Sequence, residues 1–101
     1  MKLYFRNSIG KDRFISERKD YKEIDKDIDN FLRDHNFKSY YSRTWYELKG
    51  DKTVHGIREE GRFVFDVGSH SEFFELYVDE EEVASLPDSL QKLYHETINI
   101  K

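Results

Sequence analysis

Between residues 21 and 35 the apolar side chains recur at the period of an α-helix. They lie on one continuous face: Tyr21, Ile24, Ile28, Phe31, Leu32 and His35. Charged residues hold most of the intervening positions, as on a helix surface that faces water. The pattern predicts one amphipathic helix over residues 21–35, with Asp20 as its N-terminal cap.

Alternation of apolar and polar residues predicts strands on both sides of this helix. Residues 2–17 are expected to form a β-hairpin around a turn that contains Gly10. Residues 37–48 follow the helix as an aromatic-rich strand, and the pattern leaves open which of its two faces is buried. The clear alternation at residues 62–67 and its return at residues 72–78 predict a second hairpin.

The remaining segments are polar and contain residues that favour turns and helix ends. Residues 49–61 include three glycines and are expected to form a long hairpin connection. The acidic run of residues 79–82 ends the last strand. After it, Ser85 is a candidate N-cap, and Pro87 suits the first turn of a short C-terminal helix.

Together these elements predict a single α+β domain over residues 1–101. Their order is β-β-α-β-β-β-α, which indicates an antiparallel sheet with the long helix packed across one face and the short C-terminal helix docked at an edge. In the last strand, Phe74 and Leu76 are predicted to face the core, whereas Glu75 and Tyr77 are predicted to face outward.

The composition indicates which side chains must form the core. Of the 101 residues, 37% are apolar and 38% are charged, but 16% are aromatic, so rings must supply much of the core. The absence of cysteine excludes a disulfide framework and favours a reducing, cytoplasmic setting. No stretch approaches the ~20 apolar residues that span a bilayer, so we expect no membrane insertion and no export.

The charge is unevenly distributed along the chain. Residues 1–50 hold 12 Lys and Arg against 9 Asp and Glu, whereas residues 51–101 hold 5 against 12, and the formal net charge is −4. A net negative charge disfavours a duplex-DNA binder, because such proteins gain affinity mainly by neutralising phosphates. It is compatible with a protein partner.

The chain lacks the common catalytic and cofactor-binding signatures. It contains no zinc signature, no glycine-rich phosphate loop and no serine nucleophile elbow. One local cluster, Asp66, His70 and Glu72, could polarise a histidine or hold a metal ion, but we favour the simpler interpretation that these are turn residues whose side chains satisfy loop backbone groups. We therefore expect no enzyme, no cofactor and no metal.

A second candidate site combines aromatic and basic side chains from several predicted strands. Its members are Tyr4, Arg6, Arg13, Tyr41, Arg43 and Trp45. If the first hairpin and the strand after the helix are neighbours, these side chains share one open sheet face. They could then stack bases and meet phosphates, anchor a protein partner, or pack as ordinary half-buried cross-strand rings. We take Tyr41, Arg43 and Trp45 as the candidate partner-binding residues.

The acidic run is the third candidate site. It consists of Asp79, Glu80, Glu81 and Glu82. Such a carboxylate surface can imitate a phosphate backbone and occupy a basic groove of another protein. The alternative is that the four acids end a strand and protect a sheet edge from association.

Three segments together resemble a family of uncharacterised small accessory proteins of tailed phages and prophages of Gram-positive bacteria. They are Phe5-Arg6-Asn7-Ser8, residues 31–43 with Trp45, and residues 66–74. The likeness covers about the first three quarters of the chain, and residues 49–61 look like an insertion. No activity or catalytic residue comes with it. The resemblance implies a phage protein in a bacterial cytoplasm, where short acidic proteins are often inhibitors of host defence, CRISPR nucleases included.

Two functions of different classes follow from these observations. The first is a non-catalytic inhibitor or adaptor that binds a host or defence protein through the acidic run or the aromatic residues. The alternative is an accessory protein that binds single-stranded nucleic acid through an aromatic and basic sheet face. The sequence names neither the partner nor the oligomeric state.

Overall fold

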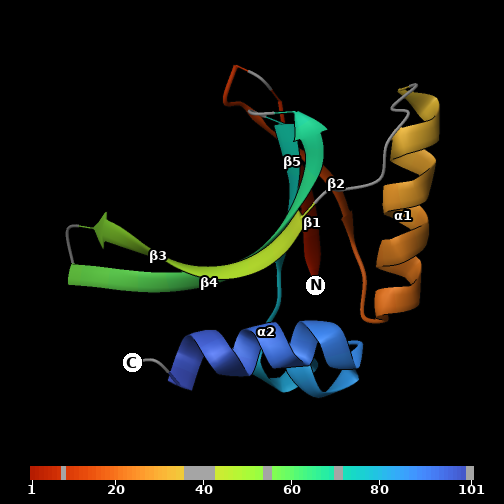
Figure 1. Cartoon of the computed structure of the whole chain (residues 1–101). Helices are drawn as coiled ribbons and strands as arrows, with labels where there is room; N and C mark the ends of the chain where they lie inside the picture. The colour runs from red at the N-terminus through yellow and green to blue at the C-terminus, as the bar shows by residue number, and fades with distance from the viewer. Residues whose placement is uncertain (8, 36–42, 54–55, 70–71, 100–101) are drawn as a thin grey trace.

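The computed structural model describes residues 1–7, 9–35, 43–53, 56–69 and 72–99. It confirms an α+β fold with one antiparallel sheet of five strands in the order β2-β1-β5-β4-β3 (Figure 1). The strands are β1 (Lys2–Arg6), β2 (Asp12–Glu17), β3 (Arg43–Thr53), β4 (Gly56–Ser69) and β5 (Glu72–Tyr77). The helices are α1 (Tyr21–Asp34), a 3₁₀-helix η1 (Glu80–Ser85) and α2 (Asp88–Asn99).

Helix α1 forms where the helical periodicity predicts it. The Asp20 side chain accepts a hydrogen bond of 3.1 Å from the backbone N–H of Lys22, so it caps the first turn as expected. Ile24 and Ile28 are fully buried, and the helix lies alongside β2 in Figure 1. The amphipathic pattern therefore directs α1 onto one face of the sheet.

Aromatic rings form the centre of the core. Phe5 of β1 lies 4.6 Å from Phe31 of α1 and 5.2 Å from Phe74 of β5, measured between ring centroids. Phe63 and Phe65 of β4 are buried in the same cluster. The prediction of a ring-rich core is confirmed, and these rings join the helix to the strands.

Residues 49–61 belong to a hairpin, as predicted, but the long connection predicted there is wrong, because most of these residues are strand. Strands β3 and β4 pair without interruption from Arg43 with Asp66 to Thr53 with Gly56, and Figure 1 shows them continuing past the other strands as a two-stranded arm. Backbone hydrogen bonds hold such a ladder, so it does not require the apolar alternation by which strands are recognised in a sequence. Residues 37–42 of the predicted strand lie outside the described residues.

Gly61 lies at the root of this arm, beneath the ring of Tyr46. A Cβ at position 61 would overlap the Tyr46 ring and hydroxyl, so any larger residue here would have to displace that ring. The Tyr46 ring packs 4.7 Å from Phe63 and 5.1 Å from Tyr94 of α2. Burial, with a smaller contribution from Tyr94, raises the pKa of Tyr46 to about 12, so its hydroxyl stays protonated at neutral pH.

The C-terminal elements complete the core. Helix α2 begins at Asp88, and the carbonyl of Pro87 accepts hydrogen bonds from the N–H groups of Leu90 and Gln91. The predicted capping role of Ser85 is wrong, because its hydroxyl donates to the carbonyl of Glu82 within η1. Helix α2 contacts β3, which is an edge strand, so its predicted docking at a sheet edge is confirmed.

Replacing Gly61 by alanine should lower the free energy of unfolding by about 1–3 kcal/mol, the usual cost of overpacking a filled site. Urea unfolding followed by circular dichroism measures this cost. In a Tyr46→Ala background the same change should cost much less, because the clashing ring is absent. Equal costs in both backgrounds would contradict the proposed clash. Ser89→Ala, on the exposed surface of α2, is the matched control.

Candidate functional site

The sheet face opposite α1 carries ladders of side chains that run across the strands. From β3 to β2, the central ladder joins Trp45, Val64, Glu75, Tyr4 and Phe14. On one side of it runs the ladder Arg43, Asp66, Phe73, Arg6 and Asp12. On the other side, Glu47 pairs with Arg62, and Lys2 pairs with both Tyr77 and Glu17. We call these residues the open face.

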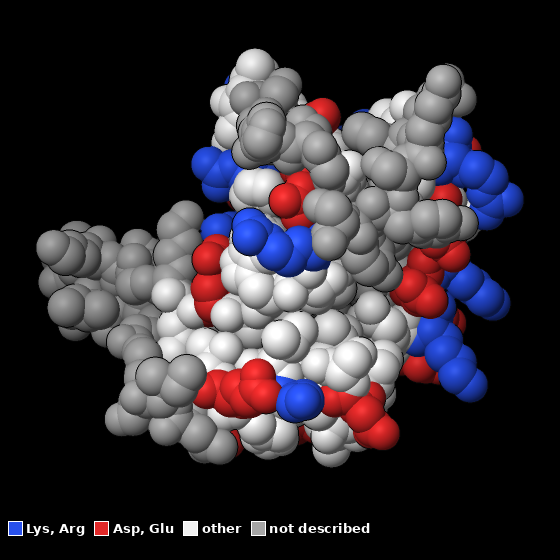
Figure 2. Space-filling view, viewed as in Figure 1, with Lys and Arg blue, Asp and Glu red and all other residues white. Residues whose placement is uncertain are grey.

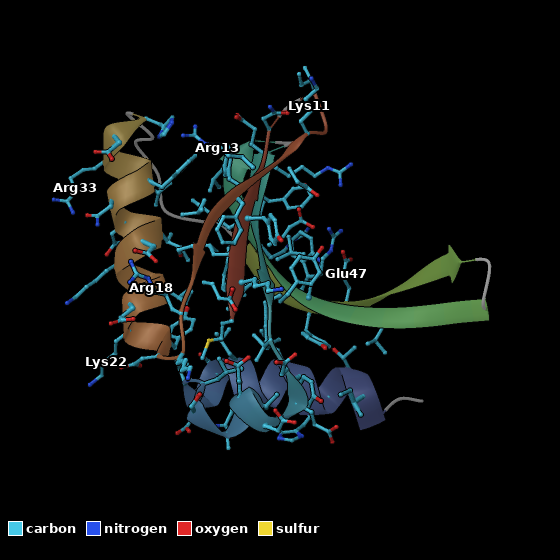
Figure 3. All side chains as sticks on the ribbon, turned by 180° about the vertical axis from the view of Figure 1, so that it is seen from behind. Lys11, Arg13, Arg18, Lys22, Arg33 and Glu47 are labelled. Carbon is cyan, nitrogen blue, oxygen red and sulfur yellow. The ribbon has the colours of Figure 1, made fainter. Side chains whose placement is uncertain are left out.

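No described helix covers the open face. The buried residues of α1, among them Ile24 and Ile28, pack with Phe5 and Phe74, whose side chains leave the sheet on the opposite side. Figure 3 shows Glu47 on the side of the sheet away from α1. Phe14 is 54% exposed on this face. An antiparallel sheet with one packed and one uncovered face is a common arrangement, and the uncovered face is available for binding.

Three rings cluster at the β2 side of the open face. The Tyr4 ring makes edge contacts with Phe14 at 5.4 Å and with Tyr77 at 5.6 Å between centroids. The sequence placed Tyr4 in the candidate site but missed Phe14 and Tyr77. The signal that could have identified them is the pairing of β1 with both β2 and β5, which a single sequence does not specify.

The predicted residues Arg43 and Trp45 lie together at the β3 edge. The Arg43 guanidinium carbon lies 4.7 Å from the Trp45 ring centroid, in a cation–π contact. The Trp45 indole N–H donates a hydrogen bond of 3.2 Å to Glu47 Oε2, which fixes the orientation of the ring. Arg43 is exposed and Trp45 is half-buried. The third predicted residue, Tyr41, lies outside the described residues.

The grouping predicted for the first hairpin is correct in part. Tyr4 shares the open face with Trp45, although β5 and β4 separate their strands. Arg13 does not belong to this face. A shift of register in the pairing of β1 with β2 puts Tyr4 opposite Phe14, and the Arg13 guanidinium lies 5.9 Å from the Phe31 ring of α1. The bulge therefore turns Arg13 toward the helix.

A charged network occupies the centre of the open face. Arg62 donates from Nε to Glu47 Oε1 over 2.7 Å, and from Nη1 to Glu75 Oε2. The hydroxyl of Tyr77 donates to the same Glu75 oxygen over 3.1 Å. Glu75 is 0% exposed and Arg62 is 8% exposed. Glu75 was predicted to face outward, and its side is correct, but the neighbouring side chains bury it completely.

The surroundings of Glu75 disfavour its charged form by more than the Arg62 guanidinium favours it. Burial and then the adjacent Asp12 carboxyl raise the pKa of Glu75, against the opposing effect of Arg62. Its Oε1 is buried and, among the described residues, has no hydrogen-bond donor. The pKa of Tyr77 is raised to about 12, first by burial and then by Glu75, so this hydroxyl remains a donor at neutral pH.

The acidic run follows the end of β5, as predicted, and two of its four residues also cap the next helix. Asp79 and Glu82 form a capping box around the start of η1, and Glu82 Oε2 lies 2.9 Å from the Met1 amino group. Edge protection is excluded, because β5 lies at the centre of the sheet. Glu80 and Glu81 are exposed, and Figure 2 shows acidic side chains over η1 and α2.

The structure offers no support for a metal site within its described part. Among the described residues, no group of three or more His, Cys, Asp or Glu is placed to hold a metal ion. Asp66 and Glu72 belong to β4 and β5, and His70 lies outside the described residues. In the described ranges, no helix combines the length and apolar character needed to cross a membrane.

No family model matches this chain, and no curated protein or solved structure matches it either.

Replacing Arg62 by methionine should lower the free energy of unfolding at neutral pH by about 3 kcal/mol, because Glu75 then stays buried without a cation. The double variant Arg62→Met with Glu75→Leu should recover most of this loss, because it removes both charges. Thermal and urea unfolding measure both variants. A double variant less stable than Arg62→Met would show that the pair is needed for more than mutual neutralisation.

The stability of the protein should depend on pH through Glu75. Its folded-state pKa is raised above the ordinary value of 4.5, so the native state binds the proton more tightly than the unfolded chain. The contribution of Glu75 to the free energy of unfolding is therefore greatest below pH 4.5 and is lost as pH rises through the folded-state pKa. Urea unfolding of the wild type and of Glu75→Gln across this range should give diverging profiles, and parallel profiles would contradict the shift.

Proposed function

We propose that this protein is a non-catalytic protein-binding module, an inhibitor or adaptor, whose docking surface is the open face. One observation carries the proposal: a sheet face that none of the described helices covers presents a half-exposed Phe14 and a stacked Arg43–Trp45 pair on a rigid, hydrogen-bonded base. Aromatic residues and arginine are the types that anchor protein interfaces. Anchors held in one orientation also lose little conformational entropy on binding.

The charges of the open face favour a protein partner over nucleic acid. Arg62 is engaged by Glu47 and Glu75, and Asp12 and Asp66 lie opposite Arg6 and Arg43 in the strand register, so acidic and basic residues alternate on this face. Affinity for a phosphate backbone requires cations whose charge is free to be neutralised by the ligand. A surface of alternating charges and rings instead suits a partner with its own complementary pattern.

The resemblance to phage accessory proteins supports a setting for this proposal. In that setting the partner is a host or defence protein of a bacterial cytoplasm, and a CRISPR nuclease is one such partner. Glu80 and Glu81 are exposed and provide a second, acidic contact beside the open face. Asp79 and Glu82 are engaged in the capping box of η1, so they support this contact indirectly.

Binding of single-stranded nucleic acid is the second candidate function. The cation–π contact of Arg43 with Trp45 favours it, because the same ring and guanidinium could stack a base. This function predicts an oligonucleotide shift that weakens steeply with salt and is lost in Trp45→Ala. A shift at low salt that Trp45→Ala abolishes would put this function first.

Truncation of the anchors should weaken binding to the protein partner. Trp45→Ala and Phe14→Ala should each lower the affinity by about tenfold or more, whereas Ile98→Ala should not. Ile98 is a matched control, because it is also an exposed hydrophobic residue but belongs to α2. The measurement is quantitative capture of bacterial proteins on the immobilised chain, followed by titration of the captured protein. Equal losses in all three variants, or no specific protein captured, would contradict the proposal.

A further inference from the structure

The Trp45 ring needs a neighbour to hold it in one orientation. It belongs to the single tryptophan of the chain and lies half-buried on β3, an edge strand. Partly exposed side chains change rotamer within picoseconds to nanoseconds unless other groups restrain them. The Arg43 guanidinium packs 4.7 Å from the ring centroid, but Arg43 is itself exposed and forms no ion pair with a described residue. The hydrogen bond from the indole N–H to Glu47 Oε2 is therefore the restraint to examine.

Glu47 is in turn held by Arg62, its cross-strand neighbour on β4. Glu47 Oε1 accepts from Arg62 Nε over 2.7 Å, and Arg62 Nη2 approaches the same oxygen. The two carboxylate oxygens have separate partners, since Oε1 receives the guanidinium and Oε2 receives the indole of Trp45. The Glu47 side chain is 37% exposed, so without Arg62 its carboxylate could turn toward water. The orientation of the indole depends through Glu47 on Arg62.

Arg62 has the rigid surroundings that Glu47 lacks. Its side chain is 10% exposed, and Nη1 donates to Oε2 of Glu75, a side chain that is 1% exposed. The Tyr77 hydroxyl donates to the same oxygen over 3.1 Å, and the Phe73 ring centroid lies 5.6 Å from the guanidinium carbon. A planar guanidinium that bonds two carboxylates and lies against a ring has one orientation available.

We propose that Arg62 is the positioning residue of the docking surface, because it holds Glu47 and thereby fixes the Trp45 ring in the orientation that meets a partner. This inference rests on the proposed function, which makes Trp45 an anchor. Arg62 is 8% exposed, so it acts through Glu47 and does not itself need to touch the partner. An anchor that is ordered beforehand loses less conformational freedom on binding, so this contact raises the affinity without enlarging the interface.

The single tryptophan allows a direct test in the full chain without a partner. The ¹⁵N heteronuclear NOE of the indole N–H reports ring motion on the picosecond-to-nanosecond scale, and the decay of tryptophan fluorescence anisotropy reports it independently. In the wild-type protein, we expect the ring to be as rigid as the backbone of β3. A freely moving wild-type ring would overturn the proposal.

Glu47→Gln tests the contact with almost no change in side-chain shape. It replaces one acceptor oxygen by an NH₂ group, which then faces either the Arg62 guanidinium or the Trp45 indole N–H, both of which are donors. The amplitude of fast ring motion should roughly double. A ring held only by packing would not respond to this substitution, so an unchanged ring in the folded variant would overturn the proposal.

A double variant, Arg62→Met with Glu75→Leu, separates positioning from stability. It leaves neither buried charge, so the fold should be retained, but it removes the group that holds Glu47. Ring motion should increase as it does in Glu47→Gln, and an increase in Glu47→Gln alone would show that Arg62 has no positioning role. The matched control is Glu17→Gln, the same substitution at an exposed position on β2, at the other edge of the sheet. An equal change of ring motion in this control would also overturn the proposal.

The positioning role and the proposed function can fail separately. With a captured partner, Glu47→Gln should lower the affinity by about three- to tenfold and should have no further effect in a Trp45→Ala background. A partner that binds through Trp45 and does not distinguish Glu47→Gln from the wild type would overturn the positioning role and leave the docking surface standing. A ring released by Glu47→Gln in a protein that captures no specific partner would leave the Arg62 contact standing and overturn the proposed function.

Discussion

The domain depends on the contact between the apolar face of α1 and the ring-lined side of the sheet. Phe5, Phe31 and Phe74 meet there, from a strand, a helix and another strand. A chain with 38% charged residues has few apolar side chains, and large rings bury the most area per residue. The rings that are buried lie mainly on this side of the sheet, and none of the described helices packs on the other side.

Polar groups buried on the open face must therefore be stabilised by other side chains of the same face. A charged group such as Glu75, buried on that face, has to find its partners among neighbouring strands, because no helix in the described part of the chain covers it. Arg62 and Tyr77 supply those partners and also hold the surface rigid. The open face therefore contributes to the stability of the fold as well as to the surface of the molecule.

The sequence predicts the features that depend on local pattern and misses those that depend on distant pairing. The spacing of Ile24 and Ile28 predicts α1, because helix periodicity is local. The burial of Glu75 is not predictable from the sequence. A carboxylate at an outward strand position is expected to be exposed, and only the fold places Arg62 and Asp12 beside it. The β3–β4 arm is also missed, because backbone hydrogen bonds hold its ladder and these leave no apolar pattern in the sequence.

The ring of Tyr46 over Gly61 gives the arm a mechanical role. Tyr46 is wedged between Phe63 and Tyr94, and the Thr97 hydroxyl of α2 lies 3.4 Å from its carbonyl oxygen. Bending the arm at its root would have to lift this ring out of the core. Because that ring also packs on Tyr94, a change in the angle of the arm would have to disturb the seat of the C-terminal helix as well.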